Sequence, residues 1–417
     1  LNVLDAPASG ALTAEIDGAG QVVGLAGTLD LAKGALRPTE QARPVPFNSS
    51  KSYIRYEAST GRLIFDQIEL DSPQLRLSAT GHADLRDFSA GIPQTLLGQL
   101  RFTNVRLAPE GMFEAPVTFV EGALDLRYRP AELALDVGQL VLRNEGAELV
   151  AKGSVNVLAE GWAVSMDAGI EEIDHGSLMA LWPENAVENT RRWLIENIQA
   201  GSVTHAHAAL RVAPEKPIDA AVSFDFSDAR VRFLKTLPPI ENARGYASIS
   251  GKSFNLGLNA GAVTAPSGGA LEAEGSGMQI PDMTAKPAVA VFDLALTGPL
   301  SAALNLLDEE PFEFLSKSGL KPDVATGIAE ITTRLTVPLE PKVEVQDVGY
   351  TVSANVRAVR SDSLMKGRSL QSDLMVVSAG DGALSIEGTG TIDDVPISVV
   401  WSRKIGAGTG TNSRVDG

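Results

Sequence analysis

The segment RLIFDQIELDSPQLRLSATG, residues 62–81, contains two stretches in which apolar and polar side chains alternate, with turn-forming residues at 71–73 between them. Alternation with a period of two is typical of a β-strand that buries one face, and a short connection of this kind joins antiparallel strands. The segment therefore predicts a β-hairpin, whose second strand carries Leu75, Leu77 and Ala79 on one face.

The same alternation recurs along most of the chain. It is found at residues 123–128, 131–157, 205–212, 221–226, 330–339 and 350–359. The connections between these stretches are generally too short for the crossover helices that parallel strands need. We therefore predict a mainly β protein built on an elongated antiparallel sheet.

One long passage departs from the alternation. DHGSLMALWPENAVENTRRWLIENIQAG, residues 174–201, predicts a helix pair near the middle of the chain. Asp174 is the expected N-cap of a short helix, a longer helix covers about 183–199, and Gly201 is the expected stop. The residues expected to pack this helix pair are Leu178, Leu181, Trp182, Val187, Trp193, Leu194 and Ile198.

A shorter helix is predicted later in the chain, at residues 299–307, where PLSAALNLL places leucine and alanine on one helical face. These elements divide the chain into six expected segments. They are an N-terminal β-groove segment at 1–173, the helix pair at 174–201, a central β-groove segment at 202–298, a short helical insertion at 299–320, a C-terminal β segment at 321–404 and a disordered or truncated tail at 405–417.

The composition restricts the class of protein. Hydrophobic residues make up 44% of the chain, which is too many for a disordered protein, but only 5% of the residues are aromatic, and 40 Gly and 23 Pro interrupt the apolar stretches. The net charge of -17 would repel phosphate backbones and anionic lipid surfaces, so we expect neither nucleic-acid binding nor electrostatic docking on a membrane. The chain has no cysteine, which excludes disulfides and thiolate metal sites.

The ends of the sequence also suggest what to expect of the parent protein. Residue 1 is Leu, no signal-peptide pattern opens the chain, and no run of about 18 apolar residues occurs. We therefore expect this chain to be a fragment, with any membrane anchor outside it.

The strand patterns predict more apolar sheet surface than the predicted helices can cover. About fifteen strands with one apolar face each need a cover, which only two helical passages can supply. Such a sheet can fold into sandwiches, close into barrels, or curl into a trough whose apolar lining contacts another molecule. We expect a curled sheet that forms an apolar groove for lipid acyl chains, because hydrocarbon gains roughly 0.8 kcal/mol per buried CH₂.

Aliphatic side chains suit such a groove because their contacts are non-directional and let a ligand slide. The residues expected to line it are Leu75, Leu77, Leu124, Leu126, Leu149, Leu210, Val212, Phe224, Leu335, Val352 and Val356.

The helical passage and the closing strand carry a resemblance to a known family. The pattern consists of Leu178 and Leu181, then Pro183, then Trp193 with Leu194, then Gly201 before a new strand, and finally VPISVVW at 395–401. It resembles AsmA-like bacterial envelope proteins, and most closely their YhdP branch. The resemblance implies a protein anchored in the inner membrane that projects into the periplasm and carries phospholipid acyl chains towards the outer membrane. It implies other envelope proteins as further partners, no catalytic residues and no cofactor.

Other candidate sites have weaker patterns. His205 and His207 share a strand face, but no third ligand lies at a spacing typical of a metal site. The glycine-rich segment 257–277 has neither a GxGxxG nor a Walker pattern, and the carboxylates at 308–310 and 393–394 lack the spacing of a calcium loop. We therefore expect no metal site, no cofactor and no enzymatic activity.

Two other functions remain open from the sequence. An envelope assembly scaffold or protein-interaction module would pack its strands into dry sandwiches and dock a partner on the helix pair. A carbohydrate-active or adhesive β-solenoid would need exposed aromatic rows or paired carboxylates. The sequence gives little support to the β-solenoid function, because the chain contains only 5 Tyr and 4 Trp.

Overall fold

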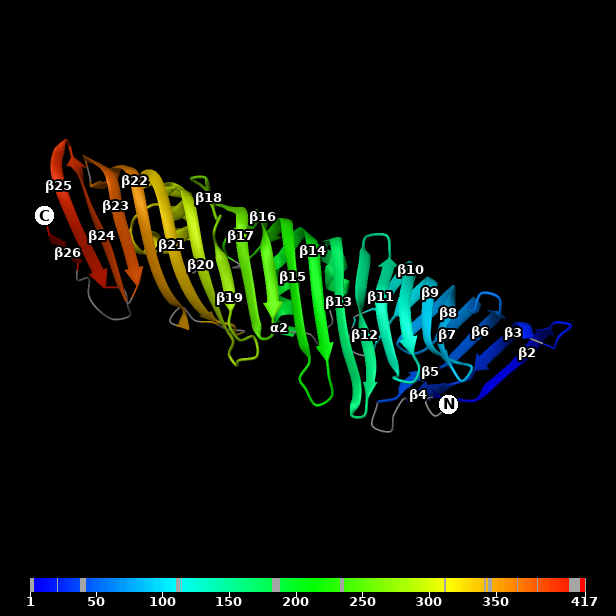
Figure 1. The fold of residues 1–417 in the computed structure, drawn as a ribbon. Helices are drawn as coiled ribbons and strands as arrows, with labels where there is room; N and C mark the ends of the chain where they lie inside the picture. Colours follow the sequence, from blue (N-terminus) through cyan, green and yellow to red (C-terminus); the bar gives the residue numbers. More distant parts are fainter. Residues whose placement is uncertain are drawn as a thin grey trace. The chain divides into compact units, whose positions relative to one another are not determined.

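The computed structural model describes residues 4–20, 22–37, 43–109, 113, 115–181, 188–232, 236–310, 313–340, 343, 347–365, 367–380, 382–404 and 413–416. Antiparallel strands make up most of these residues, which confirms the predicted mainly β class (Figure 1). The chain forms two compact units. The first unit contains residues 1–191 and 203–223, and the second contains residues 192–202 and 224–417.

The first unit is built on a sheet of ten strands that pair in chain order, each antiparallel to the next. They are β2 (Ala8–Ile16), β3 (Val22–Leu31), β6 (Ser49–Glu57), β7 (Arg62–Asp71), β8 (Leu75–Ser89), β9 (Ile92–Leu107), β10 (Val117–Arg129), β11 (Ala134–Arg143), β12 (Glu148–Leu158) and β13 (Gly161–Asp174). The hairpin predicted at residues 62–81 is confirmed as β7 and the start of β8, with Leu70 paired to Leu77.

A second, small sheet belongs to the same unit. Its strands are β1 (Leu4–Asp5), β4 (Gly34–Leu36) and β5 (Val45–Phe47), with β4 in the centre. Strand β1 precedes β2 in the chain, whereas β4 and β5 are inserted between β3 and β6 of the large sheet.

The large sheet of the first unit is curled. The indole N–H of Trp162 on β13 donates to the carbonyl of Arg43 at 3.2 Å, and the amide of Asn48 donates to the carbonyl of Asp71 on β7 at 2.8 Å. In a flat sheet, β7 and β13 would be six strand spacings apart. Asp71 on β7 and Trp162 on β13 would then lie at opposite ends of their strands, more than about 40 Å from each other. The chain from Arg43 to Asn48 spans at most about 17 Å. The curl predicted from the sequence is therefore present.

The second unit is also built from antiparallel strands. Its strands are β16 (Ile240–Ser250), β17 (Ser253–Thr264), β18 (Ala270–Glu272), β19 (Gly277–Ile280), β20 (Val289–Pro299), β21 (Thr326–Pro338), β22 (Gly349–Met365), β23 (Arg368–Gly380), β24 (Ala383–Ile392), β25 (Val395–Lys404) and β26 (Ser413–Asp416). The short strands β18 and β19 follow one another in the chain between β17 and β20, and each of them pairs with both β17 and β20. Two further strands, β14 (Ile198–Val212) and β15 (Asp219–Val231), contribute residues to both units.

Three α-helices are described: α1 (His175–Leu181), α2 (Glu188–Asn197) and α3 (Leu300–Asp308), with a 3₁₀ turn at Ser316–Ser318. The expected N-cap is confirmed, because the Asp174 carboxylate accepts the amide of Ser177 at 3.0 Å. This contact with Ser177 holds the pKa of Asp174 below its usual value. Residues 182–187, which include Trp182 and Val187, lie outside the described part of the chain.

Two details of the helix prediction are wrong. Gly201 is not the helix stop, because α2 ends at Asn197, and Ile198 is the first residue of β14 rather than part of the helix packing. Gly201 instead lies inside β14 with φ of 145°, where a Cβ would be 3.1 Å from the Cα of Ala229. Close approach of two strands, rather than helix termination, explains the glycine.

Four residues of the predicted disordered or truncated tail form a strand in the structure. Ser413–Asp416 forms β26 and pairs with β25, with Val415 opposite Trp401. The sequence signal was weak because this strand has only one apolar residue. Residues 405–412 and 417 lie outside the described part.

The core of the first unit lies at one end of its strands. Phe102, Val105, Val117, Phe119 and Leu142 are all buried there with Ala79. Phe113 and Leu181 of α1 pack against this cluster, so the first helix of the predicted pair covers one end of the sheet.

We expect replacement of Phe119 by alanine to lower the free energy of unfolding by about 3–5 kcal/mol, because the side chain is only 3% exposed and its loss leaves a cavity. Val120 is the matched control: it is the next residue on the same strand, points to the other face and is 64% exposed. Val120→Ala should change the free energy by less than about 0.5 kcal/mol. Urea denaturation monitored by circular dichroism measures both, and equal effects would contradict this assignment of the core.

Candidate functional site

The two faces of the first sheet differ in chemistry. On β10, Leu124 and Leu126 point to the same side and stand opposite Leu140 and Val137 of β11. The residues between them on β10 point to the other side and are exposed, as Asp125 shows. Since side chains alternate along a strand, this register places apolar side chains beside one another across the strands.

One row of paired residues crosses all ten strands of the first sheet without a polar side chain. It runs through Leu12, Gly27, Ile54, Phe65, Gly81, Leu100, Leu124, Leu140, Ala151 and Ala168. Nine strand spacings make this row about 43 Å long. We call the side of the sheet that carries it the first apolar face.

The first apolar face is only partly covered. Of the large side chains within the row, Leu12 is exposed, and Ile54, Phe65, Leu100, Leu124 and Leu140 are each half-buried. Each of these side chains therefore keeps part of its hydrocarbon surface accessible.

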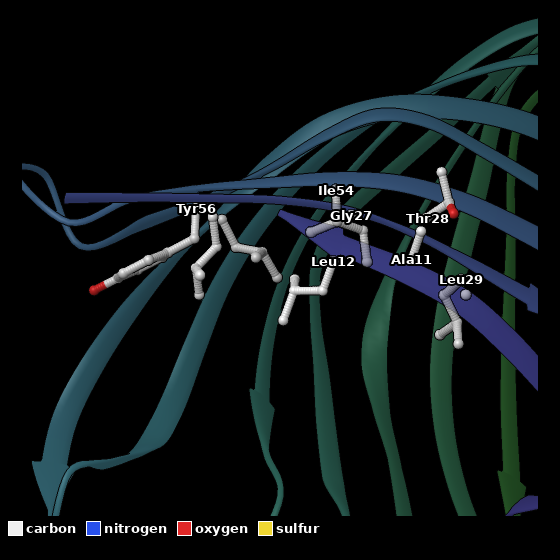
Figure 2. Close-up of a pocket in the computed structure, with 10 residues that line it drawn as sticks. Ala11, Leu12, Gly27, Thr28, Leu29, Ile54 and Tyr56 are labelled. Carbon is white, nitrogen blue, oxygen red and sulfur yellow. The ribbon is translucent and has the colours of Figure 1, made fainter. Parts of the chain in front are cut away.

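A hollow of about 330 Å³ lies on this face over β2, β3, β6 and β7. Figure 2 shows Leu12, Leu29 and Tyr56 pointing to one side of these strands, whereas Thr28 points to the other. Leu12 is 73% exposed and Leu29 is 40% exposed, so the hollow opens to solvent. Its lining is hydrocarbon apart from the occasional polar atom, which favours an apolar ligand without a fixed orientation.

The opposite face of the first sheet carries ion pairs between neighbouring strands. They are Arg55 with Asp66, Arg62 with Asp84, and Arg143 with Glu121 and Glu148, and Arg211 of the following strand β14 pairs with Asp167 on β13. Hydrogen bonds from Arg55 hold the pKa of Asp66 below its usual value, and Arg62 has the same effect on the pKa of Asp84. Exposed pairs contribute little stability individually, so their main effect is to favour one strand register.

The second unit has the same two-sided chemistry. A row of paired apolar residues crosses β20 to β25 through Leu296, Ile331, Ala354, Val377, Ile386 and Trp401. We call this side of its sheet the second apolar face. On the other side, the Arg334 guanidinium donates to both oxygens of Asp293, at 2.6 and 2.9 Å.

Helix α3 covers part of the second apolar face. Ala302 and Ala303 are buried against Leu271, and Leu296 and Ile331 pack around them. Further along the row, Val377, Ile386 and Trp401 are half-buried. The predicted short helix is therefore a partial cover, and the rest of the face stays accessible.

The structure brings eight of the eleven predicted lining residues to these two faces. Leu75, Leu77, Leu124, Leu126 and Leu149 pair with apolar partners on the first apolar face, and Leu335, Val352 and Val356 lie on the second. On β14, Arg211 bonds to Asp167 on the polar face, so Leu210 and Val212 alternate to the apolar side. Phe224 packs against the buried cluster of Phe226, Ala229 and Ala243 in the second unit.

The helix-pair residues are less fully described. Leu181 packs against the core of the first unit and Leu178 is half-buried, whereas the side chains of Trp193 and Leu194 lie outside the described part. Met179, which the sequence analysis did not select, is the buried residue of α1. The available signal was its position four residues after His175, because residues four apart lie on the same face of a helix.

Glycines on the first apolar face were also missed. Gly81 lies in the middle of β8 with φ of 157°, and a Cβ on Gly98 of β9 would be 2.9 Å from a methyl group of Leu126. These glycines make room for neighbouring side chains on the apolar face. A glycine inside an alternating stretch was the signal, and it indicates close approach rather than a turn.

The histidines and acidic groups do not assemble a metal site in the described part of the chain. No three His, Asp or Glu side chains there gather closely enough to hold a metal ion. His205 contacts Glu171 at 3.2 Å on the polar face. Among the helices described, none is both long and apolar enough to cross a membrane.

We expect Arg334→Gln to raise the pKa of Asp293 towards its ordinary value, because the hydrogen bonds from Arg334 lower it. A lowered pKa in the folded state adds stability above the unfolded value of about 3.9 and loses it as pH falls through the folded value. The stability difference between wild type and variant should therefore be present at pH 7 and shrink below about pH 4. Carboxyl NMR titration of Asp293 checks this, and an unchanged pKa in the variant would contradict it.

A scan against known protein families matches residues 22–374 to the family described as YhdP protein. Searches of curated proteins and of solved structures return no match. The matched residues are most of the chain and include the strands that form the two apolar faces, except for β2, β24, β25 and the end of β23. The chain belongs to the YhdP family of AsmA-like envelope proteins.

Proposed function

We propose that this chain is a periplasmic segment of a bridge-like lipid transport protein, in which the two apolar faces shield phospholipid acyl chains between the inner and outer membranes. The chain acts without catalysis and without a cofactor. Its parent is anchored in the inner membrane through a segment outside this sequence, and other envelope proteins are its further partners. Membership of the YhdP family supports this assignment.

The observation that carries the proposal is the unbroken apolar row across ten strands of the first unit. A row from Leu12 to Ala168 is about 43 Å long and contains no polar side chain. A site for one held ligand needs a few directed polar groups, which fix its orientation. A continuous apolar row lacks them and instead gives non-directional contact along its length.

The magnitude of hydrocarbon burial favours the same reading. A sixteen-carbon acyl chain in water would lose roughly 12 kcal/mol relative to an apolar surrounding, at about 0.8 kcal/mol per CH₂. Half-buried side chains such as Leu100 and Leu124 can supply that surrounding at many neighbouring positions. A ligand that moves from one position to the next then keeps most of its burial, so no single step has a large barrier.

The polar face supports the proposal by its contrast. Ion pairs such as Arg62 with Asp84 keep that side of the sheet wet. The charged headgroup of a phospholipid can remain in water while its acyl chains lie on the apolar side. The two-sided sheet thus matches the amphipathic character of the cargo.

Photo-crosslinking tests which face meets lipid. A photoreactive amino acid at Leu124 or Leu126 should crosslink phospholipid in cells, whereas the same group at Asp125 or Arg127 should give at least tenfold less product. The controls lie on the same strand and are more exposed than the test positions, so simple accessibility favours the controls. Mass spectrometry of the crosslinked protein measures both. Equal or greater crosslinking at Asp125 and Arg127 would contradict the proposal.

Extraction of the purified chain separates lipid transport from a scaffold function. We expect phospholipid to co-purify with the chain and to be detected by mass spectrometry. A lipid-free chain with stable, compact units would instead favour an envelope assembly scaffold.

A further inference from the structure

The small sheet of the first unit reaches across the apolar side of the large one. Trp162 on β13 pairs with Val157, and the next residue on its side of the strand, Val164, pairs with Val155. The indole ring therefore belongs to the first apolar face, and its N–H donates to the carbonyl of Arg43 at 3.2 Å. Arg43 lies just before β5, so the β4–β5 hairpin meets β13 on the apolar side.

The other end of this hairpin is fixed where β3 ends and β6 begins. The amide of Ala32 donates to the carbonyl of Pro7 at 3.0 Å, and the amide of Asn48 donates to the carbonyl of Asp71 at 2.8 Å. Strand β1 adds a third strand through the pairing of Asp5 with Ala35. Phe47 in β5 is only 6% exposed, so this end is packed as well as hydrogen-bonded.

The hairpin therefore connects two parts of the curled sheet that are far apart along its surface. One end is bonded beside β7, and the other contacts β13, six strand spacings further on. It crosses the apolar side between them. Among the described residues, the fixed end has several backbone bonds, whereas the hydrogen bond to β13 comes from the indole N–H, the one hydrogen-bond donor that a tryptophan side chain has.

We propose that the β4–β5 hairpin is a strap over the first apolar face and that the hydrogen bond from Trp162 to Arg43 is its latch. This inference rests on the proposed function. An acyl chain that moves along the first apolar face passes beneath the strap. Lateral entry of a chain at this place requires the latch to open, so Trp162 positions the strap and controls the route of the cargo.

The size of the expected effect follows from the single hydrogen bond. One such bond changes an equilibrium constant by about 2- to 12-fold. Trp162→Phe removes the N–H donor and keeps an aromatic ring on the apolar face, so the sheet itself should stay folded. The strap should then open about 2 to 12 times more often.

Two measurements test the strap on the full chain. The chain has no cysteine, so spin labels can be attached at introduced cysteines alone. Val45 in the strap and Leu158 at the end of β12 suit this, because they are 39% and 44% exposed. Electron–electron resonance between the two labels should give one narrow distance in the wild-type background and a broadened distribution with Trp162→Phe.

The second measurement is the rate at which the chain takes up a pyrene-labelled fatty acid from phosphatidylcholine vesicles. Trp162→Phe should raise this rate about 2- to 12-fold and leave the amount bound at equilibrium unchanged. Val120→Ala is the control, since Val120 lies on the other face of the first sheet, is 64% exposed and contacts neither the strap nor the apolar row. It should change neither the distance distribution nor the uptake rate.

The outcomes separate the strap from the proposed function. A broadened distance together with faster uptake supports the strap as a gate. An unbroadened distance, or a broadened distance with unchanged uptake, overturns it while leaving lipid binding in place. Absence of uptake by wild type and both variants overturns the proposed function, and the gating role with it.

Discussion

The structure depends on one constraint, which is that successive side chains of a β-strand point to opposite faces. A shift of one residue between paired strands would move a whole apolar set to the wet side. Here the pairing aligns Phe65 with Gly81 and Leu100 with Leu124, so the apolar sets of neighbouring strands meet. Ion pairs on the other face, such as Arg55 with Asp66, favour the same alignment. Each sheet therefore has one apolar and one charged side.

A sheet with one apolar side must cover it or leave it accessible. The first unit covers one end with Phe113 and Leu181, and the second unit covers part with α3. Curling of the first sheet brings its own strands towards each other and removes some further surface. These devices leave large side chains such as Leu124 and Ile386 half-buried. The remaining accessible hydrocarbon is what the proposed lipid cargo would cover.

Family membership and the geometry support each other at different levels. The family match places the chain among envelope proteins but does not identify which residues contact a ligand. The paired rows supply candidate residues, and the hollow near Leu12 and Tyr56 gives one place where an apolar ligand fits. The proposed strap at Trp162 adds a point of control on the same face.

The sequence by itself determined the local structure and the sidedness of the strands. Alternation in segments such as 62–81 predicts both the hairpin and the side on which Leu75 and Leu77 lie, because those features depend only on neighbouring residues. The tertiary structure alone decided what depends on distant contacts. The role of Gly201 depends on the approach of Ala229, the curl depends on the accumulated rotation of many strands, and the bond between Arg43 and Trp162 joins residues 119 positions apart. No local pattern encodes such contacts, since each requires the intervening strands to be paired first.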